Sequence, residues 1–364
     1  MVEIADIFRL HGPESRAPFG DRRLPSHLRA LQDIERCRTE MLGGQVYDCE
    51  TCREHHDSDH SCQHRHCPQC QHEQAQQGLE HPERLLLPVP PCRVSFTRPP
   101  ELRALARRHP QVVSHSLCRS ASAALQELAR APRFIGGSIG MVGVLHTWTR
   151  DLRDHPHVHP SVPGGGLTAD GRWLPARQDF LGPVQPLAVL CRAKFRDALH
   201  QTDLFPLVDA QVWHTAWVVH CEPVGQGEEA LRSRAPDSLR VAIRNHRILT
   251  WQEGSVTFPY KESATEEVKI CTLPAVACLR RSLPHMLPAH VIKVRYDGLL
   301  SPTNRPWLTT ARELRGTGTV EADSTGHHRD RREPTAAPSL PRCPTCGSPV
   351  ILVQTLRPKG RSPP

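Results

Sequence analysis

Two pairs of closely spaced cysteines are the first residues whose types and spacing could do chemistry. Cys49 and Cys52 form one C-x-x-C pair, Cys67 and Cys70 form another, and the 14 residues 53–66 separate them. Each pair can place two thiolates on one ion, and this separation is close to the usual range for a four-thiolate zinc site. A closed site of this kind is structural, because no ligand position stays open for substrate. The spacing therefore predicts one structural zinc held by these four cysteines.

Other residues leave the ligand set open. Cys62, His64 and His66 lie between the two pairs, so Cys62 or His66 could replace a thiolate or help to bind a second ion. Cys37 lies further upstream. The competing interpretation is that these cysteines are small core residues that bind no metal, and the two correctly spaced pairs argue against it.

A further C-x-x-C pair, Cys343 and Cys346, lies near the C-terminus. One such pair is half of a zinc site. A second zinc at this pair is therefore possible only with ligands from elsewhere, such as His327 and His328 or residues of another chain.

The motif His155-Pro-His157-Val-His159 could bind a catalytic metal ion. Residues two apart in a strand point the same way, so His157 and His159 would project together. Two neutral imidazoles on one sheet face can hold a divalent ion. The stretch GMVGVLHTW should pair beside this strand, which makes His146 a candidate third ligand. A histidine-rich surface strand is the alternative, and the partner strand and the Gly-rich turn at 164–166 favour the metal site.

Apolar spacing predicts the elements that position these residues. Helices are expected within 1–36, as two short helices over 101–131, and over 186–200. A Pro-rich joint is expected at 85–100. Strands are expected at 139–148, 155–162, 212–221, 239–251, 255–261, 267–273 and 290–296.

Composition narrows the class of protein. The chain has 364 residues, 14 cysteines, 23 histidines and a net charge of +8, which favours an anionic partner. No apolar run approaches the roughly 18 residues of a membrane span, so no membrane partner is expected. The N-terminus lacks a basic region followed by an apolar stretch, so no signal peptide is expected and we predict a cytoplasmic protein. In that compartment, cysteine pairs are more often metal ligands than disulfides.

The stretch VLHTWTRDLRDHPHVHPSVPGGGL (144–167) closely resembles the metal-site segment of the two-tyrosine, HUH-class rolling-circle transposases of bacterial insertion sequences. The stretch SCQHRHCPQCQ (61–71) resembles the zinc-binding region of that family. Resemblance to the same family extends to further segments, at 37–44, 86–107, 239–251, 272–288 and 296–305. The likeness covers roughly residues 25–315 in the expected order, and the C-terminal CPTCG fits as well.

The patterns and the resemblance together predict an α+β fold. We expect a zinc-binding, DNA-recognition module with N-terminal helices at 1–80, and a Pro-rich joint and helical connector at 81–138. The HUH catalytic core, an antiparallel sheet of about five strands flanked by helices, is expected at 139–315. A linker, expected to be disordered because it has few large apolar residues, would follow at 316–341, with a C-terminal C-x-x-C tail at 342–364.

The resemblance also implies a mechanism. The paired histidines would hold Mg²⁺ or Mn²⁺ at single-stranded DNA ends, while Zn²⁺ stays structural. A tyrosine hydroxyl would attack the phosphorus and form a 5′-phosphotyrosine link, and a second tyrosine one helical turn away would resolve the joint.

The tyrosine positions break the pattern. Counting back from the segment 239–251 places the two tyrosines at Ser233 and Asp237, with Pro236 between them, where a proline disfavours a helix. The chain has only Tyr47, Tyr260 and Tyr296, and no two lie within a helical turn. We therefore expect a transposase with impaired catalysis. The alternatives are a non-catalytic zinc-containing DNA-binding protein of the same descent and a histidine-metal phosphodiesterase that needs no protein nucleophile.

Overall fold

The computed structural model describes residues 3–16, 25–70, 87, 89–176, 183–224, 242–262, 265–288, 290–315 and 342–359. Within these ranges the chain combines helices with antiparallel sheets, which confirms the α+β class. In the described part of the chain, no helix has both the length and the apolar character needed to cross a membrane.

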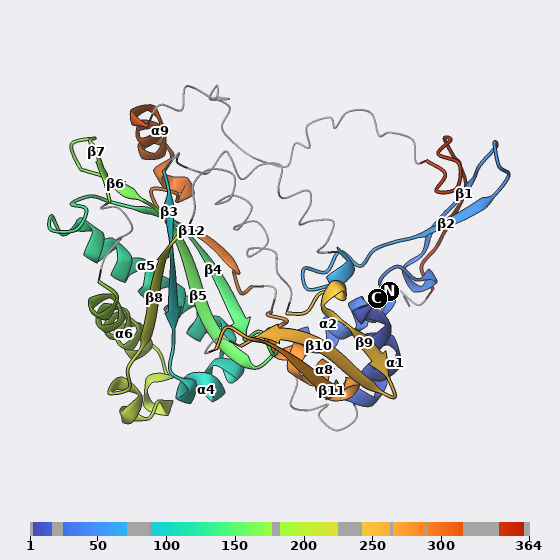
Figure 1. Cartoon of the computed structure of the whole chain (residues 1–364), viewed down its shortest axis with the longest axis horizontal. Helices are drawn as coiled ribbons and strands as arrows, with labels where there is room; N and C mark the ends of the chain where they lie inside the picture. The colour runs from blue at the N-terminus through green and yellow to red at the C-terminus, as the bar shows by residue number, and fades with distance from the viewer. Residues whose placement is uncertain are drawn as a thin grey trace.

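The largest sheet has five antiparallel strands in the order β12-β4-β5-β3-β8 (Figure 1). These strands are β3 (Pro91–Thr97), β4 (Gly140–Trp148), β5 (Asp154–Pro163), β8 (Val218–Pro223) and β12 (Val294–Gly298). One face packs against helices α5 (Pro110–Arg130) and α6 (Val184–His200), and the two layers share one hydrophobic core. The opposite face carries the histidines of β4 and β5.

Helix α5 covers the sheet because its apolar residues recur at helical spacing. Leu117, Ala121, Leu125 and Leu128 are all buried, and together they form one stripe along the helix. Two short helices were predicted over 101–131. The structure instead has the short α4 (Arg103–Arg108) followed by the 21-residue α5, which starts with a proline, a residue that is well tolerated in a first helical turn.

Strand β3 corrects the prediction of a Pro-rich joint at 85–100. Within this segment, Cys92, Val94 and Phe96 are buried in the core, while Arg93 and Ser95 are less buried. This alternation is the pattern of a half-buried strand. Pro91 is tolerated because it is the first residue of the strand. The prolines at both ends of the segment obscured a strand that lies between β5 and β8.

The strand predicted at 239–251 is also corrected. In its described part, a 3₁₀ turn at Asn245–Arg247 precedes β9 (Thr250–Gln252). Ile243 and Ile248 are both buried, and residues five apart would face opposite sides of a continuous strand. The turn brings both side chains into the same core. The segment 212–221 likewise begins as a 3₁₀ helix before β8, and 290–296 becomes a strand only from residue 294.

A second core joins the N-terminal helices to a later part of the chain. It contains Phe8 from α1 (Ile4–Arg16), Leu31 from α2 (Pro25–Arg36) and Leu279 from α8 (Ala275–Ser282). It also includes a three-stranded sheet formed by β9, β10 (Ser255–Lys261) and β11 (Val268–Pro274). The helices beside the predicted zinc module therefore fold against residues 243–286.

A small three-stranded ribbon stands apart from both cores (Figure 1). Its strands are β1 (Gly44–Asp48), β2 (His55–Asp59) and β13 (Ile351–Leu356), in the order β13-β1-β2. The other elements of the described ranges are β6 (Gly165–Leu167), β7 (Trp173–Pro175) and α9 (Arg305–Leu314), together with short 3₁₀ helices. The domain boundaries given above stay a prediction.

Candidate metal centres

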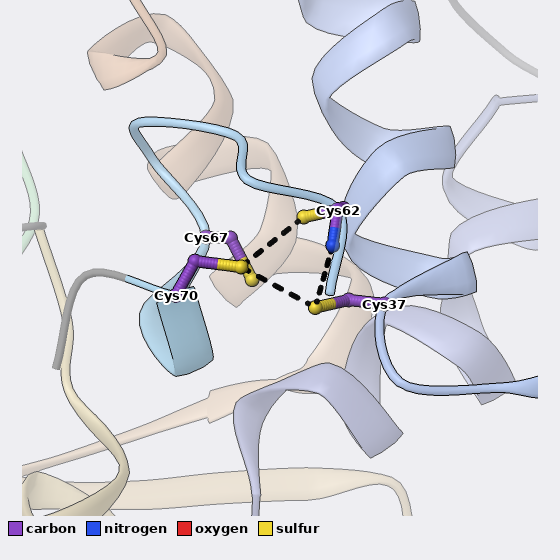
Figure 2. A group of neighbouring side chains, drawn as sticks. All are labelled: Cys37, Cys62, Cys67 and Cys70. Atoms are coloured by element: carbon purple, nitrogen blue, oxygen red, sulfur yellow. Dashed lines mark hydrogen bonds between the residues drawn. The ribbon is translucent and has the colours of Figure 1, made fainter. Parts of the chain in front are cut away.

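Four cysteines of the N-terminal region converge on one point in the structure. They are Cys37, Cys62, Cys67 and Cys70, and their sulfur atoms all lie within 4.8 Å of one another (Figure 2). The Cys37 and Cys70 sulfurs are 3.5 Å apart, and those of Cys62 and Cys70 are 3.6 Å apart. Four sulfurs at the usual Zn–S distance would lie about 3.8 Å apart in a tetrahedron, so this donor set fits zinc.

Different elements bring these four thiols together. Cys37 follows the last residue of α2, and Cys62 follows β2. Cys67 and Cys70 are buried against the helices of the second core. The backbone N–H of Cys62 donates to the Cys37 sulfur at 3.4 Å, as suits a thiolate ligand.

The structure does not bring together the four cysteines that spacing predicted to share an ion. Cys49 and Cys52 lie at the tip of the β1–β2 hairpin, whereas Cys37 and Cys62 flank its base. A five-residue strand is about 17 Å long, so tip and base cannot share one ion. Cys62, an alternative ligand in the sequence, lies in the first cluster, while His66 lies outside it.

Cys49 and Cys52 instead lie beside the C-terminal pair. The Cys49 and Cys346 sulfurs are 3.4 Å apart, and those of Cys52 and Cys343 are 3.5 Å apart. All four sulfurs lie within 4.8 Å of one another. His327 and His328, the partners considered for the C-terminal pair, lie outside the described residues.

The third centre consists of three histidines on adjacent strands. In the β4–β5 ladder, His146 lies opposite His157, and His159 lies opposite Val144. One ring nitrogen from each of His146, His157 and His159 lies within 4.8 Å of the others. Because opposite residues of an antiparallel pair project from the same face, the pairing places all three imidazoles together.

Hydrogen bonds orient two of these rings. His157 donates from Nδ1 to the backbone carbonyl of His155 at 2.5 Å. His159 Nδ1 bonds the hydroxyl of Ser95 on β3 at 2.6 Å. Both contacts engage Nδ1, as is usual for histidines that bind a metal through Nε2. His155 therefore contributes through its backbone.

Burial also favours the neutral form of His157, which is the form that can bind a metal. It lowers the pKa of His157 to about 3, and the neighbouring His159 acts in the same direction. The imidazole is therefore neutral near neutral pH, and a neutral nitrogen is the form that binds a metal. The ring of Trp148 stacks on His146, with centroids 5.1 Å apart, and closes one side of the cluster.

The predicted nucleophile positions, Ser233 and Asp237, lie outside the described residues. Tyr47 lies in the ribbon and Tyr260 in β10. Tyr296 lies in β12 opposite Val142, so it shares the sheet face of His146. His146 is four positions along β4 from Val142, which corresponds to about 13 Å.

A cavity of about 620 Å³ lies behind the opposite face of β5. Its lining includes Asp154 and Pro156, which alternate with His157 along the strand. Three arginines, Arg107, Arg108 and Arg280, also line it, and Arg107 forms an ion pair with Asp154 at 2.8 Å. The excess of positive charge suits an anion such as a phosphate.

Ser95 and Cys37 were not assigned site roles from the sequence. The alternation along 92–97 would have placed Ser95 on the histidine face. Cys37 is 25 residues from Cys62, and no local spacing rule connects the two.

Comparisons with known proteins identify related families and proteins. Residues 140–306 match the family described as "Putative transposase", and residues 7–98 match the "Transposase zinc-binding domain". The chain is 33% identical over 369 residues to the "Putative transposase y4qJ" of Sinorhizobium fredii, covering 94% of this chain and 92% of the relative. It is 26% identical over 314 residues to the "Transposase for insertion sequence element IS801" of Pseudomonas savastanoi pv. phaseolicola, covering 74% and 71%. No solved structure matches the chain.

The two matched families, a transposase zinc-binding domain and a transposase, follow one another along the chain and place it in the class of transposases. The chain belongs to the IS91-like transposase family, as its resemblance to transposases predicted. The matched zinc-binding domain contains the whole first thiol cluster, which supports a structural zinc ion there.

Proposed function

We propose that this transposase binds the single-stranded DNA ends of its element in the cytoplasm, as rolling-circle transposition requires. We also propose that His146, His157 and His159 form its divalent-metal site. The convergence of the three imidazoles carries the proposal. Mg²⁺ or Mn²⁺ bound there would polarise the scissile phosphodiester. Mn²⁺ is the better probe of the two because its binding can be followed by electron paramagnetic resonance.

The surrounding residues support this role. Ser95 and the His155 carbonyl fix the two ring orientations, so the Nε2 atoms need not reorganise when an ion binds. The proposed DNA ends are polyanions, and the chain carries a net charge of +8.

Cleavage additionally needs a nucleophile in line with the leaving oxygen, and the chain lacks the expected one. Serine and aspartate stand at 233 and 237. A serine hydroxyl is far less acidic than a phenol and needs an adjacent base. Tyr296 is about 13 Å along the sheet from His146, too far to attack a phosphate held by the cluster. We therefore propose impaired catalysis, with DNA binding retained, which is also the behaviour of a non-catalytic DNA-binding derivative.

A labelled oligonucleotide carrying an element end, incubated with Mn²⁺, tests the proposal. We expect binding in a gel-shift assay, no covalent adduct on a denaturing gel and no strand cleavage. The triple variant Ser233→Tyr, Pro236→Arg, Asp237→Tyr should gain an adduct, because it restores both hydroxyls and removes the helix-breaking proline.

Two outcomes would contradict the proposal. An adduct formed by the unmodified chain would mean that another tyrosine attacks, and the variants Tyr260→Phe and Tyr296→Phe would identify it. Cleavage that yields a free 5′-phosphate without an adduct would instead point to a metal-dependent phosphodiesterase. Loss of that cleavage in the His157→Ala, His159→Ala variant would assign it to the histidine cluster.

A further inference from the structure

We infer that Cys49, Cys52, Cys343 and Cys346 bind a second structural zinc ion, which closes a zinc ribbon assembled from the two ends of the chain. This site goes beyond the proposed DNA function and does not depend on it. It also lies partly outside the matched zinc-binding domain, which ends at residue 98 and so contains neither Cys343 nor Cys346.

The sulfur geometry is that of a four-thiolate site. The contacts Cys49–Cys346 and Cys52–Cys343 join residues 297 and 291 positions apart, and each C-x-x-C pair faces the other. Sulfur separations of 3.4 and 3.5 Å are close to the roughly 3.8 Å edge of a zinc tetrathiolate. Zinc is favoured over other ions because four soft thiolates in a tetrahedron suit it.

The two C-x-x-C turns have the same backbone hydrogen-bond pattern, although they lie far apart in the sequence. In the first, the N–H of Arg53 donates to the Cys49 carbonyl and the N–H of Cys49 donates to the Glu54 carbonyl. In the second, the N–H of Gly347 donates to the Cys343 carbonyl and the N–H of Cys343 donates to the Ser348 carbonyl.

The residue after the second cysteine of each turn completes this equivalence. Arg53 has φ of 57° and Gly347 has φ of 75°, so both adopt the left-handed conformation. That conformation is costly for arginine, and a repeated turn of this shape is expected where both cysteines must face one ion. The two turns therefore form a matched pair of metal knuckles.

Apolar burial alone is too small to hold the C-terminal segment in place. Among its described residues, 342–359, the buried apolar contacts with the ribbon belong to a small cluster centred on Cys49, Cys343 and Val350. Ile351, Leu352 and Val353 of β13 are about half exposed, at 50%, 48% and 58%. Structural units below about 40 residues usually need a metal or disulfides for stability. A bound zinc ion would supply the stability that so small an apolar cluster cannot provide.

Polar contacts also help to hold the C-terminal segment against the β1–β2 hairpin. Strand β13 pairs with β1 from Gly44↔Leu356 to Asp48↔Ile351. The Thr345 hydroxyl donates to the Glu54 carboxylate at 2.6 Å and so links the two knuckles. The Nε2 atom of His56 lies 3.1 Å from the Cys343 sulfur. As an N–H donor, His56 would stabilise the thiolate from outside the ligand set.

Zinc content of the purified, reduced chain tests the inference. We expect two zinc ions per chain, measured by native mass spectrometry and elemental analysis. Cys346→Ser should retain one. Cys271→Ser, a matched change in β11 outside both clusters, should retain two. His56→Ala should also retain two, because its imidazole is a neighbour of the ligands. One zinc in the unmodified chain, two in Cys346→Ser, or one in His56→Ala would each overturn the assignment.

A second experiment tests whether zinc joins the chain ends. A specific protease site is inserted into the full chain between Gly316 and Pro341, and the purified protein is cleaved under reducing conditions. Residues 342–364 should then co-elute with the rest of the chain and separate when a chelator is added. In the Cys346→Ser background they should separate without chelator, while the first zinc stays bound.

The opposite results would each overturn the inference. Separation in the presence of zinc would show that the ion does not hold the tail. Retention in excess chelator would show that strand pairing suffices. Release by reductant alone would mean that disulfides, rather than zinc, join the two knuckles.

Discussion

At the scale of single residues, the histidine cluster depends on which nitrogen each ring presents. Ser95 engages Nδ1 of His159 and the His155 carbonyl engages Nδ1 of His157, while one ring nitrogen of each lies within 4.8 Å of the others in the cluster. A rotated or flipped ring would direct a proton, instead of a lone pair, at the ion. In the proposed metal site, the residues that orient the rings would therefore influence the metal affinity as well as the rings themselves.

The first prediction concerns this cluster. The double change His157→Ala, His159→Ala should abolish Mn²⁺ binding, measured by electron paramagnetic resonance, and leave the melting temperature nearly unchanged. Ser95→Ala should weaken Mn²⁺ binding by about 10- to 100-fold, as is typical for residues that orient metal ligands. Ser95→Thr should restore affinity because it keeps the hydroxyl, and His155→Ala serves as the control because it keeps the carbonyl. Undiminished Mn²⁺ binding by the double variant would disprove the site.

The second prediction concerns His285, which is buried beside Thr147 of β4. Burial lowers the pKa of this histidine from 6.5 to about 4, while Asp154 raises it and Arg107 lowers it. The ring contacts the Thr147 hydroxyl and the Leu152 carbonyl. The unfolded chain therefore takes up a proton near pH 6.5, whereas the folded chain does so only near pH 4.

The contribution of His285 to the free energy of unfolding is therefore fully present above pH 6.5. It decreases by roughly 3 kcal/mol in total as the pH falls towards 4. His285→Gln should reduce the slope of unfolding free energy against pH across that window, measured by urea denaturation. The buried His66 also has a lowered pKa, so part of the slope should remain. An identical slope in the variant would show that His285 does not couple folding to pH.

At the scale of elements, the β1–β2 hairpin acts as a spacer between two thiol clusters. Its base lies at Cys37 and Cys62 in the first cluster, and its tip carries Cys49 and Cys52 in the second. The strand length sets a separation of about 17 Å. The first cluster is packed into the second hydrophobic core, whereas the second cluster belongs to the separate ribbon.

The third prediction follows from this division. Cys67→Ser should remove the zinc of the first cluster and loosen α1 and α2, because Cys67 is fully buried in the core that they share. Hydrogen exchange should accelerate in both helices. In Cys346→Ser, exchange should accelerate in β1 and leave α1 and α2 unchanged. Equal effects of the two variants on the helices would contradict two separate centres.

At the scale of the whole molecule, residues distant in sequence complete both parts of the N-terminal region. Helices α1 and α2 pack with residues 243–286, and the hairpin pairs with residues 351–356. The five-stranded sheet similarly combines β3 with strands drawn from 140–298. Folding of the zinc-binding domain is therefore expected to depend on nearly the complete chain.

The fourth prediction concerns DNA affinity. Binding to single-stranded DNA should weaken steeply between 50 and 200 mM salt, because bound cations are released when basic side chains contact phosphates. Arg108→Ala, in the cavity of three arginines, should reduce the slope of log affinity against log salt by about 1. Arg130→Ala, an exposed arginine at the far end of α5, is the control. Affinity independent of salt would exclude an electrostatic DNA-binding surface.

The sequence by itself determined the features that depend on local spacing. Period-two alternation placed His157 and His159 on one face, adjacent strands placed His146 near them, and each C-x-x-C pair marked one half of a metal site. The α+β class and the transposase family could also be predicted from the sequence, because the helix, strand and metal-ligand motifs occur in a fixed order along the chain. Prolines around β3 and the irregular spacing of Ile243 and Ile248 obscured local structure in those two segments.

Only the tertiary structure decided which cysteine pairs lie together. Spacing along the chain favoured Cys49 and Cys52 with Cys67 and Cys70, because the intervening loop is short. The paired strands of the hairpin, however, hold its tip about 17 Å from its base. Pairing of β13 with β1 then brings Cys343 and Cys346 to the tip, across almost 300 residues. Such a partnership depends on strand pairing between distant segments, and no local pattern encodes it.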